Sequence, residues 1–237
     1  MRVRAMGAQE AAAPRARTRH RTMAEAALEE LREAIILGEL TPGAPLRLED
    51  LARSLGMSIS PIREAVRQLE ALGLAEHVPH HGAKVVALDV DDLRELFEVR
   101  LALETLAVRG AARRFTDDDA ADARSSLGAY ARARRSRDVR AAMRAHTAFH
   151  FTLYEAARSA WLARLIRPAW DSCERYRPAL LSAKGPLQDR HQALDEELLA
   201  ACERHDEERA ATALRAHLEL AGEFYAVELG ERGIFDR

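Results

Sequence analysis

Two histidines one helical turn apart, an aspartate and a third histidine have the residue types of a metal site. His146 and His150 stand at i and i+4, so both rings share the apolar face of a predicted helix. Asp195 and His217 lie on two later predicted helices, at equal distances from a turn predicted near Asp206, which places them at one height in an antiparallel pair. Three imidazoles and one carboxylate suit zinc or a similar divalent ion, with one or two positions left for water or a ligand. The alternative is that each histidine is an ordinary core or surface residue.

A second group of functional residue types lies in the stretch from Leu48 to Gly73. The pattern predicts two short helices joined by a tight turn, because Gly56 supplies a left-handed residue and Pro61 fits the first turn of the next helix. In a helix-turn-helix the second helix lies in the major groove with its N-terminal residues toward the base edges. The residues at that place are Ser58, Ile59, Ser60, Arg63 and Arg67. The stretch predicts DNA binding, with an ordinary corner between two helices as the alternative.

A hairpin is predicted directly after these helices. Residues 74–79 and 83–88 read as two short strands around a turn at residues 80–82. A two-stranded flap after a recognition helix is a wing, and His80, His81 and Lys84 are placed to contact the DNA backbone or the minor groove. A plain hairpin that only packs the domain is the alternative.

Composition agrees with a helical protein of two domains. The 237 residues are rich in helix-forming types, with 12 Gly, 8 Pro and 5% aromatics. The formal net charge of −2 is not the basic signature of a nucleic-acid-binding chain, so DNA affinity must come from locally placed arginines. Cys173 and Cys202 fall in apolar helical patterns, as buried thiols of a reducing compartment do. Without a membrane-span-length apolar run or a signal core, we expect no membrane association and a cytoplasmic location.

The predicted fold is mainly α. We expect a flexible arm at residues 1–21, a winged helix-turn-helix DNA-binding domain at 22–88 that opens with a helix over 22–37, and a helical effector-binding and dimerisation domain at 89–237. The second domain is predicted to be an antiparallel all-helical bundle. Its helices are expected at roughly 90–113, 117–135, 138–157, 159–183, 187–203 and 206–229.

Two segments carry a family resemblance. The run ILGELTPGAPLRLEDLARSLGMSISPIREAVRQLEALGLAEHVPHHGAKV resembles the N-terminal winged helix of GntR-family bacterial transcriptional regulators. The continuation DVDDLRELFEVRLALETLAVRGAARR resembles the first helix of the FCD effector domain in the FadR-like branch. One departure is Ile59, because the family usually has Arg before the Ser/Thr-Pro step. An apolar residue there cannot donate to guanine, and contact with a thymine methyl is the expected replacement.

The resemblance also bears on the metal site. FCD domains of the metal-binding kind use Asp-x3-His on one helix and a His on each of two later helices. Here His146 stands where the family usually has Asp, and Asp195 where it usually has His, so two ligand types have exchanged places. His191, one turn before Asp195, is a substitute for it. The expected cofactor is a divalent metal, zinc first, with nickel or manganese as alternatives.

Arg100 lies on the inward stripe of the first helix of the predicted bundle, and the resemblance implies that it reaches the ligand cavity beside the metal. A guanidinium and a metal together suit a small carboxylate. The alternative is a salt bridge from Arg100 to Glu104 at i+4. Arg175, Tyr176 and Arg177 are further candidates for the rim of a pocket.

The function expected from these features is sequence-specific transcriptional regulation, most often repression in this family, and not enzymatic catalysis. A homodimer would bind two half-sites of a palindromic double-stranded operator, and a small organic acid in the helical domain would control it. One alternative class is a helical metalloenzyme acting on a small carboxylate, which leaves the DNA-binding features unexplained. Another is a nonspecific architectural DNA protein, which the mildly acidic second domain disfavours.

Overall fold

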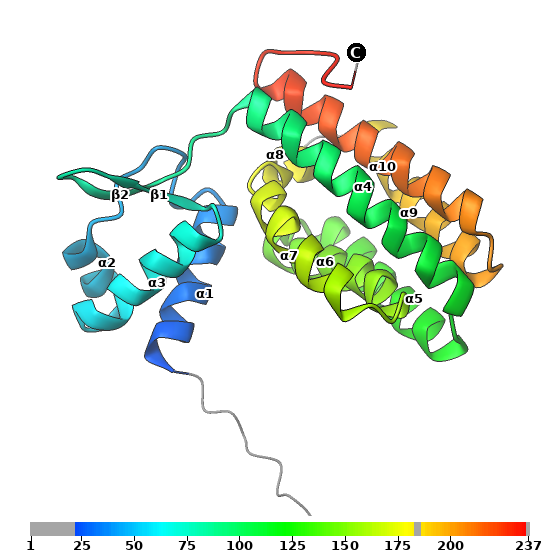
Figure 1. The fold of residues 1–237 in the computed structure, drawn as a ribbon, viewed down its shortest axis with the longest axis horizontal. Helices are drawn as coiled ribbons and strands as arrows, with labels where there is room; N and C mark the ends of the chain where they lie inside the picture. The colour runs from blue at the N-terminus through cyan, green and yellow to red at the C-terminus, as the bar shows by residue number, and fades with distance from the viewer. Residues whose placement is uncertain (1–21, 183–185, 236–237) are drawn as a thin grey trace, which may run out of the picture.

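The computed structural model describes residues 22–182 and 186–235. Figure 1 shows a small N-terminal body and a larger helical body joined by an extended link. Each has its own apolar core, since the buried residues fall into two separate clusters. The arm predicted at residues 1–21 lies outside the described residues. In the part of the chain described, no helix is both long and apolar enough to cross a bilayer.

The small body is a winged helix-turn-helix, as predicted, and is called the winged-helix domain below. Its elements are α1 (Met23–Ile36), α2 (Leu48–Leu55), α3 (Ile59–Ala71), β1 (Ala75–Val78) and β2 (Gly82–Val85). Thr22 and Glu25 start α1 with a reciprocal capping box. Gly56 ends α2 with φ 62°, a left-handed conformation that a residue with a side chain adopts only at a cost. Ile62 and Leu69 are fully buried and hold α3 in the core.

The predicted hairpin is present. β1 and β2 are antiparallel, with Ala75 opposite Val85 and Val78 opposite Gly82, so both strands are shorter than the predicted spans. The backbone of Val85 also bonds to Gly43 and Ala44, which pairs the second edge of β2 with the segment before α2. The hairpin is therefore anchored at its base by backbone hydrogen bonds on both sides of β2.

The larger body, called the helical domain below, is an all-helical bundle. It consists of α4 (Val90–Arg114), α5 (Asp117–Ser136), α6 (Val139–Ala156), α7 (Ala160–Glu174), α8 (Arg177–Ser182), α9 (Pro186–Glu203) and α10 (Glu207–Glu228). In Figure 1, α4 runs across the near side of this domain, with α10 on one side of it and α7 on the other.

One helix boundary was predicted wrongly. The single helix expected over 159–183 is divided into α7 and α8, with a turn at residues 175–176 between them. Pro178 explains the division, because it has no N–H to give to the carbonyl of Glu174 and its ring crowds that carbonyl. Because of this turn, Arg175 and Arg177 no longer belong to one helix, so their side chains need not lie on neighbouring faces of the same helix.

Polar contacts join the two domains through α1, α6 and α7. Asp171 on α7 pairs with Arg32 on α1. Arg175 Nη1 donates to the carbonyl oxygen of Val86 at 3.1 Å, at the start of the link. On α6, Arg140 Nη1 lies 2.7 Å from an Oε atom of Glu33. The end of α7 is thus bonded to the winged-helix domain at more than one point.

Candidate metal centre and nucleic-acid interface

The start of α3 presents a polar, exposed surface. Ser58, the N-cap residue, makes no capping hydrogen bond with its side chain, and the Ile59 side chain is 37% exposed. Ser60, Arg63 and Arg67 are also exposed or at the surface, and all three line one open groove that reaches Ala24 of α1. Of the five residues predicted to face base edges, Ser60, Arg63 and Arg67 therefore share one groove, and Ser58 and Ile59 are exposed just before it in the chain. Helical spacing alone accounts for this, because the buried residues of α3 occupy the opposite face.

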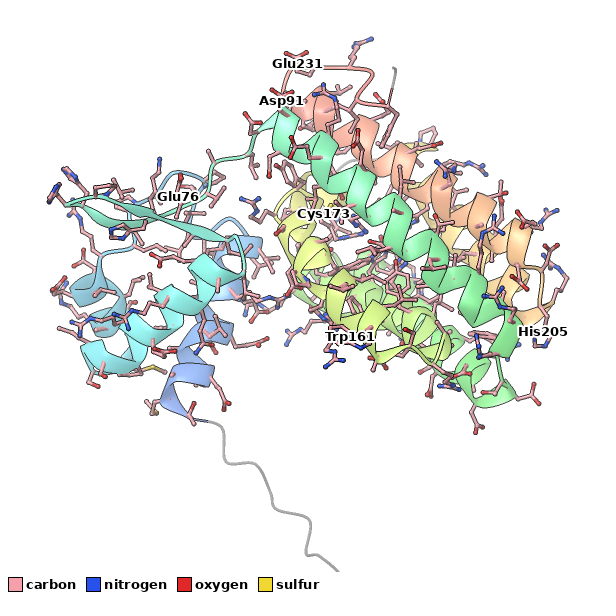
Figure 2. All side chains as sticks on the ribbon, in the orientation of Figure 1. Glu76, Asp91, Trp161, Cys173, His205 and Glu231 are labelled. Atoms are coloured by element: carbon pink, nitrogen blue, oxygen red, sulfur yellow. The ribbon has the colours of Figure 1, made fainter. Side chains whose placement is uncertain are left out.

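The hairpin turn lies on the same outer side. In Figure 1, the beginning of α3 and the tip of the β1–β2 hairpin both point away from the helical domain. His80, with φ 64°, and His81 are exposed at this tip. Lys84 stands further back on β2, where its Nζ lies 3.1 Å from an Oε atom of Glu76, the wing residue labelled in Figure 2. If Lys84 contacts DNA, its ammonium group must give up the ion pair with Glu76 to form one with a phosphate.

The helical domain brings its predicted ligands together in its interior. His146 and His150 come from α6, Asp195 and His191 from α9, and His217 from α10, and none of the five is more than 1% exposed. The four predicted residues and the substitute occupy one place, so His191 stands beside Asp195 and does not replace it. One ligand atom from each of His146, His191, Asp195 and His217 can be chosen so that all four lie within 4.8 Å of one another.

The distances within this cluster match those between ligands of one ion. His217 Nδ1 and His150 Nε2 lie 2.9 and 3.2 Å from Asp195 Oδ1, and His146 Nε2 lies 3.6 Å from Asp195 Oδ2. Two atoms each about 2.1 Å from a tetrahedral ion would stand about 3.4 Å apart. Five candidate groups exceed the four that a tetrahedral site needs, so one of them is available for a second role.

Unsatisfied polar atoms test whether a cation fits. Both carboxylate oxygens of Asp195, both ring nitrogens of His191 and the Nδ1 atoms of His146 and His217 are buried and make no hydrogen bond of acceptable geometry, although His217 Nδ1 lies only 2.9 Å from Asp195 Oδ1. Each such atom costs about 1–3 kcal/mol when it is left without a partner. A bound divalent cation would supply a common partner to several of these atoms, so the donor set fits a metal.

Burial sets the charge state of the cluster. It lowers the pKa of His146 and of His191 well below the usual value, and it lowers that of His150 to about 4. Burial would raise the pKa of Asp195, but His217 and His146 outweigh it and hold that pKa well below its usual range. The rings of His146, His150 and His191 are therefore neutral and present lone pairs beside the ionised carboxylate, as ligation requires.

A hydrogen-bonded chain orients one of the histidines. The Tyr154 hydroxyl donates to Glu104 Oε2 at 2.5 Å and lies 3.2 Å from His150 Nδ1. Because that hydroxyl proton is given to the carboxylate, its oxygen accepts from an Nδ1–H of His150. This assignment leaves the lone pair of His150 Nε2 toward Asp195 and His146. Partners of this kind fix the tautomer of metal-binding histidines.

Arg100 forms the salt bridge to Glu104 that the sequence analysis gave as the alternative to a contact with the effector. Its Nε donates to Glu104 Oε1 at 2.6 Å, and its Nη1 donates to Cys173 Sγ at 2.9 Å. Its guanidinium also lies 5.0 Å from the centre of the Trp170 ring. Arg100 is thus part of the chain that supports His150. The other predicted thiol, Cys202, is buried and free, as is Cys173.

Arg177, which the sequence analysis gave only as a candidate for the rim of a pocket, is buried in the structure. It is 3% exposed, its Nε donates to Glu174 Oε1 at 2.7 Å, and its Nη1 is buried with no hydrogen-bond partner. Its guanidinium lies 5.9 Å from the centre of the Trp170 ring, which stacks on His146, and its charge contributes to the lowered pKa of His146. Arg175 instead donates to the Val86 carbonyl at the link between the domains. The sequence signal was Pro178, which interrupts the helix so that the chain turns at residues 175–176, just before Arg177.

Comparison with known families divides the chain in the same way. The model for "Bacterial regulatory proteins, gntR family" matches residues 23–85, and the model for "FCD domain" matches residues 95–220. A protein named "Probable D-xylose utilization operon transcriptional repressor", from Paenarthrobacter nicotinovorans, is 36% identical over 187 residues, which cover 78% of this chain and 80% of that protein. The regulator BphR of Paraburkholderia xenovorans is 31% identical, with 84% and 83% covered.

Solved structures agree with these sequence matches. Escherichia coli McbR/YncC has a TM-score of 0.74 at 26% identity, and the match covers 83% of this chain and 93% of that one. A GntR transcriptional regulator from Rhodococcus sp. RHA1 has a TM-score of 0.72 at 25% identity, with 87% and 97% covered. Both matches include the winged-helix and the helical domain, as their coverage requires.

Proposed function

The chain belongs to the GntR family of bacterial transcriptional regulators and has an FCD domain, and on that premise we propose that it is a repressor controlled by a metal-dependent effector site. The reader of DNA is assigned to residues 22–88 and the sensor to residues 89–237. The family is one of transcriptional regulators and not of enzymes, so the buried metal cluster serves binding. The further steps of the proposal concern the DNA, the metal, the effector and the coupling between them.

The DNA part of the proposal assigns base reading to the start of α3. Arg63 and Arg67 are suited to guanine, Ser58 and Ser60 to bases or phosphates, and Ile59 to a thymine methyl. His80, His81 and Lys84 of the hairpin contact the backbone or the minor groove beside it. Two copies of the protein bind the two half-sites of a palindromic operator. The exposed position of these residues on one outer side supports the assignment.

The metal part assigns His146, His150, Asp195 and His217 as ligands, with His191 as the fifth group. Zinc suits nitrogen and oxygen ligands in a site of four, and nickel or manganese are the alternatives. The metal supplies a Lewis acid that can hold an anionic oxygen of a ligand. The unsatisfied atoms of Asp195 and His191 support this part, because they are buried and lie close enough together to bind one ion.

The effector part assigns recognition of a small carboxylate to this cluster and to Arg177. A guanidinium with a buried Nη1 that has no partner is suited to a second carboxylate oxygen. Arg100, already bonded to Glu104 and Cys173, holds the position of His150 and does not have to leave it. An acid with a carboxylate and a second polar group would use both the metal and Arg177.

The coupling part rests on α7 and the turn that follows it. Trp170 and Glu174 face the cluster, since the Trp170 ring stacks on His146 at 5.6 Å and Glu174 holds Arg177. Asp171 and Arg175, from the same stretch, are bonded to Arg32 and to the Val86 carbonyl of the winged-helix domain. An effector that moves Trp170 or Arg177 therefore also moves Asp171 and Arg175, whose contacts position the winged-helix domain. Its effect on DNA affinity equals its difference in affinity for the two arrangements.

The observation that carries the proposal is one chain with an outward α3 surface and a buried cluster of unsatisfied His and Asp atoms. The test selects binding sites from a random duplex library with the purified protein and measures metal by elemental analysis of the same sample. We expect a palindromic consensus and about one divalent metal per chain. His150→Ala should lose metal, whereas His77→Ala, at an exposed position on β1, should keep it. Metal content unchanged in His150→Ala would remove His150 from the ligand set, metal content unchanged in Asp195→Ala as well would refute the metal site, and binding without sequence preference would refute the assignment of DNA reading to α3.

A further inference from the structure

A pocket lies where the winged-helix domain meets the helical domain, and it is called the interdomain pocket below. Figure 1 shows α1 on the side of the small body that faces the helical domain. The pocket has a volume of about 170 Å³, which exceeds the about 10–15 Å³ that one water molecule needs. It is partly open to solvent, so a ligand can enter without unfolding either domain. Its lining includes four arginines from three helices, Arg32 of α1, Arg140 and Arg144 of α6, and Arg167 of α7.

The carboxylates that line the interdomain pocket already have partners. Glu33 lies 2.7 Å from Arg140 Nη1 through one of its oxygens. Glu174 Oε1 accepts a hydrogen bond from Arg177 Nε, also at 2.7 Å. Glu29, the third acid of the lining, has an interaction of its own. The negative charges of the pocket are therefore paired, and a cationic ligand would have to displace existing contacts.

Several donor groups of the interdomain pocket, in contrast, have no partner. Arg32 pairs with Asp171 through one Nη atom, but its Nε is buried and makes no hydrogen bond. Among the described residues, Arg167 makes no ion pair, and its guanidinium lies 3.4 Å from the centre of the Phe151 ring. Burial lowers the pKa of Arg167, and the nearby carboxylate of Asp171 does not offset this. These spare donors favour a ligand that is rich in acceptors and negatively charged.

Donors that come from three helices suit a phosphate group. Arg32, Arg144 and Arg167 reach the pocket from α1, α6 and α7, and so from different directions. Arg144 is only weakly engaged, because its one ion pair in the described part of the chain is with Glu33 at 4.0 Å. A carboxylate offers two oxygens in one plane, which one arginine fork already matches. A phosphate offers three strong acceptor oxygens and a charge of about −1.5 to −2, so it can bind several arginines at once.

One wall of the interdomain pocket is apolar. Ile36 and Leu37, at the end of α1, and Met143 of α6 are among its lining residues. Inorganic phosphate has no group to place against this wall, whereas the carbon chain of a phosphate ester does. The lining therefore suits the phosphate ester of a small metabolite as well as free phosphate.

Thr147 and Glu174 separate the interdomain pocket from the buried cluster, and both line the pocket. Trp170 Nε1 donates to Thr147 Oγ1 at 3.2 Å, and the Trp170 ring stacks on His146 of the cluster. Glu174 holds Arg177, to which recognition of the effector is assigned. The pocket and the cluster are therefore two different places that share one wall of side chains.

We propose that the interdomain pocket is a second ligand site that takes a phosphate group, either free or as the ester of a small metabolite. The phosphate bridges Arg32 of the winged-helix domain to Arg144 and Arg167 of the helical domain. A ligand held in this way stabilises one arrangement of the two domains, because it binds both of them. Binding of the phosphate is independent of the proposed function, and only its effect on DNA affinity rests on that function.

The first experiment titrates the full chain with inorganic phosphate and, separately, with glycerol 3-phosphate by calorimetry, at an ionic strength held constant with chloride. We expect one site per chain, with the ester tighter if the natural ligand is a metabolite and equal if it is free phosphate. Arg167→Met should weaken binding at least about tenfold, because it removes the charged donor and keeps an apolar stem. Arg164→Met, at an exposed position on the same helix, is the matched control and should bind as the wild type does. Equal affinity in Arg167→Met, or no saturable binding to the wild type, would overturn the site.

Two controls test the other places where a phosphate could bind. Arg63→Ala removes a donor of the α3 surface, and chelation removes an ion from the buried cluster. Neither should abolish phosphate binding. Its loss in Arg63→Ala would place the phosphate on the DNA-reading surface, and its loss after chelation would place it at the cluster. Either result would overturn the proposal.

The second experiment seeks a gain of affinity, which the loss of a merely structural contact would not produce. Glu33→Gln removes the carboxylate charge that Arg140 and Arg144 now share, so phosphate should bind about fivefold more tightly. Glu30→Gln removes the same charge from an exposed position on α1 and should leave the affinity unchanged. An affinity that stays the same or falls in Glu33→Gln would overturn the assignment of these arginines to the ligand.

The third experiment measures operator affinity by fluorescence anisotropy with saturating phosphate and with chloride at equal ionic strength. Phosphate should change the affinity of the wild type by about fivefold or more and should not change that of Arg167→Met. The operator should in turn change the phosphate affinity by the same factor, because the coupling is reciprocal. Phosphate that binds without changing operator affinity would overturn the bridge between the domains. A protein that prefers no DNA sequence would contradict the proposed function and leave the phosphate site standing.

Discussion

The two functional regions of this protein are built in opposite ways. The α3 surface consists of exposed residues from one short segment, and its neighbours in space are its neighbours in sequence. The candidate metal cluster consists of buried residues from α6, α9 and α10, separated by up to 71 positions between His146 and His217. Changes at the exposed surface should therefore affect binding and leave stability unchanged. Changes in the buried cluster should affect both.

Metal removal is expected to have the largest effect. An ion present at a thousandfold excess over its Kd stabilises the folded state by about 4 kcal/mol. For a protein of this size the melting temperature should therefore fall by about 10 °C after chelation. Differential scanning fluorimetry before and after chelation, and after return of zinc, measures this. Asp195→Ala should abolish the response, whereas Asp189→Ala, exposed on the same helix, should retain it. An equal response in both variants would show that the stabilising ion binds elsewhere.

Arg63→Ala should have the next largest effect, and only on DNA. Loss of a side chain that contacts a base costs about 1–3 kcal/mol, or about fivefold to 150-fold in affinity. Because Arg63 is exposed, the melting temperature should not change. Fluorescence anisotropy with the selected operator measures the affinity, and Arg190→Ala on α9 is the control for removal of an exposed arginine. Undiminished affinity in Arg63→Ala would remove α3 from the reading surface.

A smaller effect is expected where the two regions are joined. Arg32→Ala removes the ion pair with Asp171, which is partly buried between the domains. The operator affinity with and without effector should become more similar, by about 1 kcal/mol of coupling free energy. The metal content should not change, because neither residue touches the cluster. Arg94→Ala, which removes an exposed pair with Asp91 within α4, is the control. If the effector changes the operator affinity of Arg32→Ala as much as that of the wild type, the Arg32–Asp171 contact does not couple the effector site to DNA binding.

Lys84→Ala should have the smallest effect. A lysine that contacts phosphate contributes similarly to every DNA sequence, and its removal should lower the slope of log affinity against log salt by about 1. The loss of affinity should be below that of Arg63→Ala, since Lys84 also gives up its contact with Glu76 to bind DNA. A titration over salt concentration on specific and random duplexes measures both. A sequence-dependent loss would instead make Lys84 a reader of bases.

The winged-helix domain was predictable in detail because its signals are local. The helix predicted over 22–37 and the left-handed Gly56 are present, and the helix starts at a capping box of Thr22 and Glu25, a pairing of residues three positions apart. The hairpin followed from alternating residues around a short turn, although its strands end earlier than expected. Each of these features depends on a few consecutive residues, so no knowledge of the tertiary structure was needed.

The helical domain was predictable in its helices and less so in its contacts. The shared face of His146 and His150 followed from helical spacing, and the hairpin of α9 and α10 placed Asp195 near His217. The division between α7 and α8 was missed, although Pro178 was visible. The roles of Arg177 and Arg100 could not be chosen from spacing, because a long side chain reaches several partners and only the surrounding helices decide among them.

The sequence by itself determined the order of helices, the helix-turn-helix, the wing and the set of residues able to ligate a metal, because periodicity, caps and turn residues act over a few positions. Only the tertiary structure decided that His191 joins the four expected groups. It also decided that Arg100 bonds to Glu104 and Cys173, whereas Arg177 keeps a donor without a partner. Finally, it placed α7 between the cluster and the winged-helix domain, with contacts to both. These outcomes depend on how helices distant in the chain pack together, and that packing is set by the whole apolar core and not by any one segment.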